Sequence, residues 1–103
     1  MGEPVRVAYA VSKAGITALS RHIATKWGKQ GIRCNSIAPG MVLTEGAKAN
    51  MSEAERDEVL AWTRLPRLGS PDDIAGMAAY LLSDDGAWVT GQTMHVNGGV
   101  GLT

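Results

Sequence analysis

The sequence has 103 residues, of which 45% are hydrophobic and 19% charged, and its ten basic side chains balance its ten acidic ones. This size predicts one small domain, and a net charge of zero provides no field to attract a nucleic acid or an anionic membrane surface. No apolar run approaches the ~20 residues that span a bilayer. Cys34 is the single cysteine, so an internal disulfide is excluded and a cytoplasmic location is expected. The two histidines have no second ligand at metal spacing, so no metal site is expected.

The first predicted element is a long helix that follows an entry loop. A loop is expected over residues 1–8, and a helix from Tyr9 to about Lys29. Apolar residues recur there at every fourth position, the spacing of one helical face: Val11, Gly15, Leu19, Ile23 and Trp27. Gly28 and Gly31 are typical of a helix end, where glycine readily adopts the left-handed conformation.

Two side chains near the start of this helix indicate proton chemistry. Tyr9 and Lys13 are four residues apart, so a helix places them side by side on one face. A neighbouring ammonium favours the ionised form of a phenol, and a phenol tuned in this way can donate or accept a proton in carbonyl or alcohol chemistry. The same spacing also arises by chance, with Lys13 simply solvated, so the pair needs support from other motifs.

A short strand is predicted next. The segment 32–38 is interpreted as a strand with poor alternation, because polar residues interrupt it at Arg33, Asn35 and Ser36. Pro39-Gly40 stops the strand sharply. An irregular loop is expected over 41–50.

Two further helices have clear start signals. Ser52, with Glu55 three residues later, forms a capping box, and its helix is expected to run to about Thr63. Ser70 is a good N-cap for the next helix. The residues after it suit the first helical turn and the positive end of the helix dipole: Pro71, Asp72 and Asp73.

The last predicted strand covers Thr93–Val96, where the pattern alternates, and Asn97-Gly98-Gly99 closes it. The tryptophans are interpreted as packing anchors, and Trp62 is also the one candidate among them for substrate contact: Trp27, Trp62 and Trp88.

The order helix, strand, helix, helix, strand predicts an α/β fold. Helices between two strands are the signature of a crossover in a parallel sheet. Two strands alone do not make a stable parallel sheet, whose faces must be covered and whose edges must be paired. We therefore expect these residues to form an incomplete part of a larger sheet.

Five blocks of residues carry a resemblance to a known family. They are Tyr9-x-x-x-Lys13-Ala14, Ile32 to Gly40 with Thr44, Gly69 to Ala75, Thr90-Gly91-Gln92, and Val96 to Gly99. In this order they resemble the C-terminal portion of the classical short-chain dehydrogenases/reductases, in particular the branch similar to three-oxoacyl-carrier-protein reductase. The resemblance implies that residues 1–103 are the C-terminal part of a Rossmann-like, doubly wound parallel sheet. Such proteins move a hydride between NAD or NADP and a small-molecule carbonyl or alcohol.

The resemblance also implies roles for individual residues. Tyr9 is implied as the general acid/base on the substrate oxygen, and Lys13 as the residue that tunes Tyr9 and binds the nicotinamide ribose. At Pro39 and Gly40 the backbone is implied to pass close to the nicotinamide. The Val42 backbone and the Thr44 hydroxyl are implied to hold its carboxamide. The implied cofactor-binding residues are thus Tyr9, Lys13, Pro39, Gly40, Val42 and Thr44.

Beyond the site, the resemblance implies that segment 41–63 is a mobile substrate loop and lid. It also implies that helix 9–29 and the C-terminal strand are surfaces through which subunits of a dimer or tetramer meet.

Several parts of the family pattern are not found in the 103 residues. Among them are the Gly-x-x-x-Gly-x-Gly turn that binds the pyrophosphate at a helix N-terminus, the active-site Asn, and a Ser about a dozen residues before Tyr9. Two hypotheses therefore stay open. The chain is the C-terminal portion of an oxidoreductase and inactive alone, or it is a non-catalytic remnant that associates with itself or with a partner.

Overall fold

The computed structural model describes residues 3–101, with side chains from Val7 to Gly101. In chain order the described elements are α1 (Glu3–Trp27), the 3₁₀ helix η1 (Gly28–Gln30), β1 (Ser36–Pro39), α2 (Glu45–Asn50), α3 (Glu53–Trp62), α4 (Pro71–Leu82), the 3₁₀ helix η2 (Asp84–Gly86) and β2 (Thr93–Val96). The predicted α/β order is confirmed, with the short helix α2 as an addition between β1 and α3.

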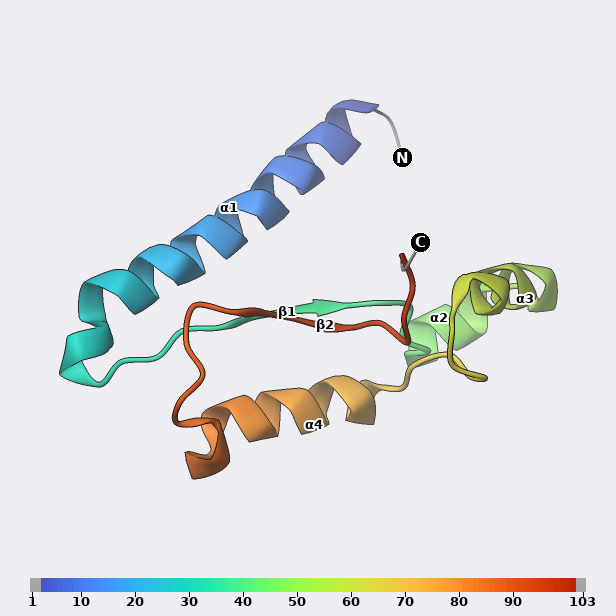
Figure 1. Ribbon diagram of the computed structural model, residues 1–103. Coiled ribbons are helices and arrows are strands. Elements are labelled where there is room, and N and C mark those ends of the chain that lie inside the picture. Colours follow the sequence, from blue (N-terminus) through green and yellow to red (C-terminus); the bar gives the residue numbers. More distant parts are fainter. Residues whose placement is uncertain (1–2, 102–103) are drawn as a thin grey trace.

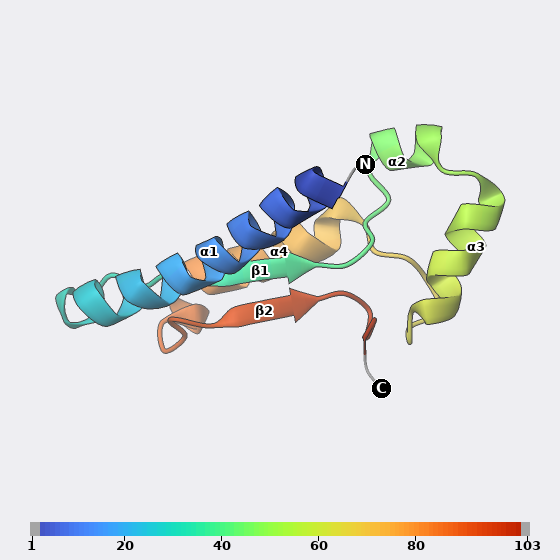
Figure 2. The ribbon, with the colours of Figure 1, turned by 90° about the horizontal axis from the view of Figure 1, so that it is seen from above.

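The two strands form a parallel sheet with a helix on each face. Ser36 of β1 lies opposite Thr93 of β2, and Pro39 lies opposite Val96. Figure 1 shows α1 above the sheet and α4 below it. Seen from above, α1 lies over β1, and β2 runs beside β1 (Figure 2). Both strands point the same way, so the loops that follow their carboxyl ends share one end of the sheet.

β1 begins at Ser36, later than the predicted start at residue 32, because the polar residues before it bond to the loop that precedes β2. Arg33 Nη1 and Asn35 Nδ2 both donate to the Val89 carbonyl, at 3.1 and 2.9 Å. Asn35 Oδ1 accepts the Gln92 N–H at 3.1 Å. Two of the residues that break the alternation, Arg33 and Asn35, therefore tie the segment before β1 to the loop before β2.

α1 begins at Glu3, so the predicted entry loop is wrong for residues 3–8; residues 1–2 lie outside the described part of the chain. Pro4 falls in the first turn, where its missing N–H and fixed φ suit a helix. α1 ends at Trp27, two residues before the predicted end, and continues as η1. Gly31 has a φ of 85° and donates its N–H to the Gly28 carbonyl, which confirms the predicted glycine end.

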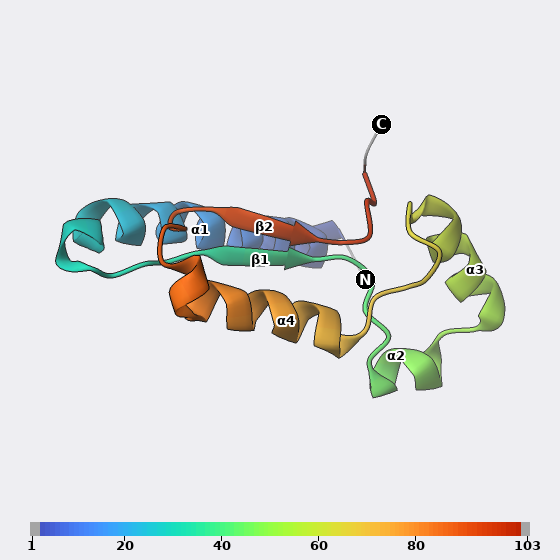
Figure 3. The ribbon, with the colours of Figure 1, turned by 60° about the horizontal axis from the view of Figure 1, so that its bottom comes forward.

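α2 and α3 form an arm that projects beyond the end of the sheet (Figure 3). The predicted loop over 41–50 is wrong from Glu45 onward, because Thr44 caps α2 by accepting a backbone N–H at 3.1 Å. The start of α3 is confirmed: Ser52 Oγ accepts the Glu55 N–H at 3.1 Å.

Little apolar surface is buried in this arrangement. Within residues 7–101 Leu81 is the one buried apolar side chain, while Ser20 and Ser36 are buried polar ones. The radius of gyration is 16.0 Å, against about 13 Å for a compact chain of this length. The accessible surface of 7652 Å² also exceeds the roughly 5,500 Å² expected of a compact protein of 10.8 kDa. The expectation that much apolar surface has nothing in this chain to pack against is confirmed.

The interpretation of Trp62 and Trp88 as packing anchors is wrong for this structure. Their exposed fractions are 67% and 98%, because no described element covers them. Trp27 is half-buried, and its ring meets that of His22 edge-on at 6.5 Å between centroids. Over residues 3–101, no helix combines the length and the hydropathy of a membrane span.

Candidate functional site

Tyr9 and Lys13 lie side by side on α1, as their spacing predicts. Lys13 Nζ is 5.3 Å from the centroid of the Tyr9 ring. Tyr9 is 60% exposed, and among the side chains described, from Val7 to Gly101, no carboxylate forms an ion pair with the Lys13 ammonium. The phenol and the ammonium are therefore both available to a ligand.

The pair opens onto a groove between α1 and the sheet, which we call the α1 groove. It has a volume of about 290 Å³ and is lined by Tyr9, Lys13, Ile16, Thr17, Ser36, Ile37, Ala38, Pro39 and Thr93. At its inner end the helix meets the strand directly, because Ser20 Oγ and Ser36 Oγ are 2.7 Å apart and hydrogen-bonded. The structure therefore brings Tyr9, Lys13 and Pro39 to one groove.

Gly40 follows β1 at a point where the two strands approach closely. Its N–H donates to the Val96 carbonyl at 2.9 Å. A Cβ at this position would lie 2.7 Å from both Cα and Cβ of Asn97. Glycine is therefore required at position 40 because Asn97, the residue after β2, leaves no room for a Cβ.

Val42 and Thr44 lie farther along the same loop and line other hollows. Val42 forms an isolated parallel bridge with Gly69, and the Leu43 N–H donates to the Gly69 carbonyl at 2.8 Å. Within residues 3–101 the Val42 N–H makes no hydrogen bond. Thr44 Oγ1 accepts the Ala47 N–H at the start of α2, but its hydroxyl hydrogen remains available to a ligand.

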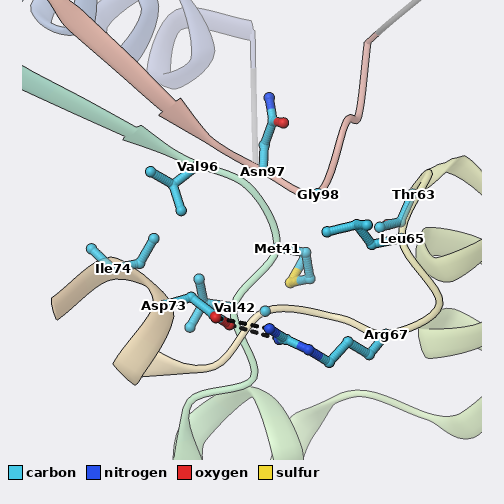
Figure 4. A pocket seen from close by; sticks show the side chains of 11 residues that line it. Met41, Val42, Thr63, Leu65, Arg67, Asp73, Ile74, Val96, Asn97 and Gly98 are labelled. Carbon is cyan, nitrogen blue, oxygen red and sulfur yellow. Dashed lines mark hydrogen bonds and ion pairs between the residues drawn. The ribbon is translucent and has the colours of Figure 1, made fainter. Parts of the chain in front are cut away.

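A second hollow, of about 100 Å³, lies where the arm joins the body (Figure 4). Arg67 makes a two-pronged ion pair with Asp73 on its rim, at 2.7 and 2.9 Å. The Arg67 guanidinium, with help from the Ser70 N–H, holds the pKa of the Asp73 carboxyl well below its usual range. Sequence reasoning placed Asp73 at a helix start but missed Arg67, because a pair six residues apart has no helical or strand spacing.

The exit of the arm is fixed at the same place. The Gly98 carbonyl accepts the N–H groups of Arg64 and Leu65, at 2.8 and 3.2 Å. Gly98 has a φ of 63°, and a Cβ there would lie 2.8 Å from Thr63 Cγ2. In the described part of the chain, no group of three or more His, Cys, Asp and Glu side chains is placed to hold a metal ion.

Comparison with known proteins identifies the family. Residues 1–101 match the family model described as enoyl-(acyl carrier protein) reductase. The chain belongs to the short-chain dehydrogenase/reductase family. It is 46% identical to a 7alpha-hydroxysteroid dehydrogenase of Bacteroides fragilis over 89% of its own length and 36% of that protein.

Solved structures agree with this assignment. A short-chain type dehydrogenase/reductase from Mycobacterium ulcerans superposes with a TM-score of 0.83 at 39% identity, over 89% of this chain and 34% of the other. A 7 alpha-hydroxysteroid dehydrogenase complexed with NADH and 7-oxoglycochenodeoxycholic acid gives a TM-score of 0.83 at 40% identity, over 91% of this chain and 37% of that one. The chain thus spans little more than a third of the length of these relatives, and its fold is part of theirs.

Proposed function

We propose that this chain supplies the proton-transfer part of an NAD(P)-dependent oxidoreductase that interconverts a carbonyl and an alcohol. The observation that carries the proposal is the Tyr9–Lys13 pair, whose Nζ-to-ring distance is 5.3 Å, at a groove that reaches Pro39 at the carboxyl end of β1. Parallel α/β sheets bind ligands outside the carboxyl ends of their strands. The NADH bound to a relative 40% identical in sequence supports the cofactor class.

Tyr9 is the general acid/base in this proposal. Its hydroxyl gives a proton to the substrate oxygen during reduction and takes one during oxidation. Lys13 lies beside the Tyr9 ring, and its ammonium has no carboxylate partner among residues 7–101. Lys13 would also hold the ribose of a bound cofactor through hydrogen bonds from its ammonium.

The residues after β1 suit a nicotinamide and its carboxamide. The Val42 N–H is a free donor within the described residues, and the Thr44 hydroxyl keeps a hydrogen to donate. Pro39 lines the α1 groove, and Gly40 follows it directly in the chain. When bound, the dinucleotide supplies or accepts the hydride. The projecting arm, within the proposed lid segment 41–63, closes over the substrate.

The proposal assigns the pyrophosphate of the cofactor to a part of the whole protein beyond these 103 residues, because they contain no Gly-x-x-x-Gly-x-Gly turn. Catalysis needs the proton donor and the hydride donor held together, so the chain alone is expected to be inactive. The whole protein is proposed to work in the cytoplasm as a homo-oligomer, with contacts through helix 9–29 and the C-terminal strand.

The second candidate is a non-catalytic module that associates with itself or with a relative. The exposed apolar residues of α1 favour it: Val7 and Val11 are 59% and 66% exposed. Association alone does not require Tyr9 and Lys13 to face one groove, so the effect of removing the Tyr9 hydroxyl separates the two candidates.

The experiment is a graft. Residues 1–101 replace the matching C-terminal segment of the Bacteroides fragilis dehydrogenase, and alcohol oxidation is followed through NADH formation. We expect turnover in the graft and a loss of at least ~10²-fold in Tyr9→Phe, with NADH binding retained. Tyr80→Phe on α4 is the matched control and should keep full turnover. Near-normal turnover in Tyr9→Phe would exclude the proposed mechanism, and a graft that binds NADH without turnover would favour the second candidate.

A further inference from the structure

Two of the few buried side chains in this chain are serines that bond to each other. Ser20 and Ser36 are 7% and 9% exposed, and their Oγ atoms are 2.7 Å apart. Ser20 Oγ also donates to the Ile16 carbonyl at 3.0 Å. Because Ser20 has one hydroxyl hydrogen, that bond leaves Ser36 as the donor to Ser20. The hydrogen bonds therefore run in one direction, from the strand through Ser20 into the backbone of α1.

This contact is the last hydrogen bond between helix and sheet on the way to Tyr9. Toward its C-terminal end α1 is also held by Ile32, whose N–H donates to the Trp27 carbonyl at 3.3 Å. From Val7 to Leu19, where the side chains are described, no hydrogen bond joins α1 to another described element. Figure 1 shows the helix close to the sheet near its C-terminal end and diverging from it toward its N-terminal end.

Ser20 also has the right phase to control the catalytic face. Lys13 and Tyr9 precede it by seven and eleven residues, which is about two and three full turns, so all three share one side of α1. At 1.5 Å per residue, Tyr9 lies about 16 Å along the axis from Ser20. A tilt of roughly 5° about Ser20 then moves Tyr9 by about 1.4 Å, and a misplacement of about 1 Å is enough to cost ~10²-fold in rate.

We propose that the Ser20–Ser36 pair is a positioning device that sets the tilt of α1 over β1, and so the place of Tyr9 and Lys13 relative to the carboxyl end of the sheet. This inference rests on the proposed function for its catalytic meaning. Its geometric content does not, because the pair fixes the helix whether or not the groove holds a cofactor.

The test measures the tilt directly in the 103-residue chain. Nitroxide labels are placed on Val7→Cys, near the start of α1, and on His95→Cys, on β2, after Cys34→Ser removes the native thiol. Pulsed electron paramagnetic resonance then gives the distribution of the distance between the two labels. We expect a single narrow distribution in the labelled parent. In Ser36→Ala it should shift or broaden by about 3 Å, which is a tilt of about 10° at the ~20 Å between Ser20 and Val7.

Three further variants make the result specific. Ser20→Ala/Ser36→Ala leaves no hydroxyl unpaired, so it keeps its fold but should show the same broadening. Ser36→Thr retains the hydroxyl and should restore the narrow distribution. Ser12→Ala removes a hydroxyl that bonds only within α1, to the Tyr9 carbonyl at 2.8 Å, and should match the parent. Each of three outcomes would overturn the proposal. The distance distribution of the parent could be as broad as those of the alanine variants, both alanine variants could keep a narrow distribution, or Ser36→Thr could broaden as much as Ser36→Ala. None of these readings depends on cofactor or turnover, so a failed graft experiment leaves them unaffected.

Discussion

Replacing Gly40 with alanine tests how closely the ends of β1 and β2 approach each other. The new Cβ would lie 2.7 Å from Cα and Cβ of Asn97, well inside the about 3.5–4.0 Å of an ordinary carbon–carbon contact. The Gly40 N–H donates to Val96 at 2.9 Å, so the loop cannot withdraw without losing that bond. Overpacking costs about 1–3 kcal/mol, and the stiffer unfolded chain returns about 0.4–1 kcal/mol. We expect Gly40→Ala to lower the free energy of unfolding by about 1–2 kcal/mol.

Urea denaturation followed by far-ultraviolet circular dichroism measures this loss, provided that parent and variant share one slope, so that a lower midpoint means lower stability. Gly76→Ala is the matched control. Gly76 lies inside α4, and a Cβ there meets nothing within 4 Å, so alanine should raise the free energy of unfolding by about 0.5–1 kcal/mol. A Gly40→Ala midpoint equal to or above that of the parent would refute the close approach on which this reasoning depends.

One further prediction concerns the connection between the arm and the body, and another the cap of α3 within the arm. The pKa of Asp73 is lowered in the folded chain by Arg67, so the ion pair contributes stability above the unfolded pKa of about 4, and that contribution is lost as the pH falls. Asp73→Asn should therefore have a lower urea midpoint than the parent at pH 7, and the difference between the two midpoints should be smaller at pH 3. For Asp72→Asn, the difference from the parent should not change with pH. A difference for Asp73→Asn that stays constant with pH would contradict this assignment. Ser52→Ala removes the cap of α3 and should destabilise that helix by about 1 kcal/mol, seen as roughly fivefold faster hydrogen exchange in α3 with no change in α4; equal exchange in α3 would show that the cap contributes nothing.

Elements whose signals are local could be predicted from the sequence. Ser52 and Ser70 mark the starts of α3 and α4 because a cap acts on N–H groups only two or three residues away. Gly31 ends the first helix because its own backbone must adopt a positive φ. The bounds of β2 were predicted as they are found, since its alternation is undisturbed by polar contacts.

Features that depend on distant residues could not be predicted. The start of β1 is set by Arg33 and Asn35 reaching the Val89 carbonyl, more than fifty residues away in the chain. Thr44 was assigned to the cofactor and not to a helix cap, and the six residues of α2 carry too little apolar pattern to indicate a helix. The pairing of Ser20 with Ser36 likewise has no sequence signature, because either serine reads as an ordinary surface residue until the helix is laid on the strand.

The two faces of α1 link the site to the rest of the whole protein. Tyr9, Lys13 and Ser20 face the sheet, whereas Val7 and Val11 lie on the opposite side of the helix and are largely exposed. Exposed apolar residues gathered on one side of a helix are typical of a surface that another element or subunit covers. If a second copy covers the outward face, as proposed, it holds the N-terminal half of α1, which the sheet does not hold beyond Ser20. Subunit contact and the serine pair would then constrain the same tilt from opposite sides. Loss of either contact should therefore misplace Tyr9 without changing its spacing from Lys13.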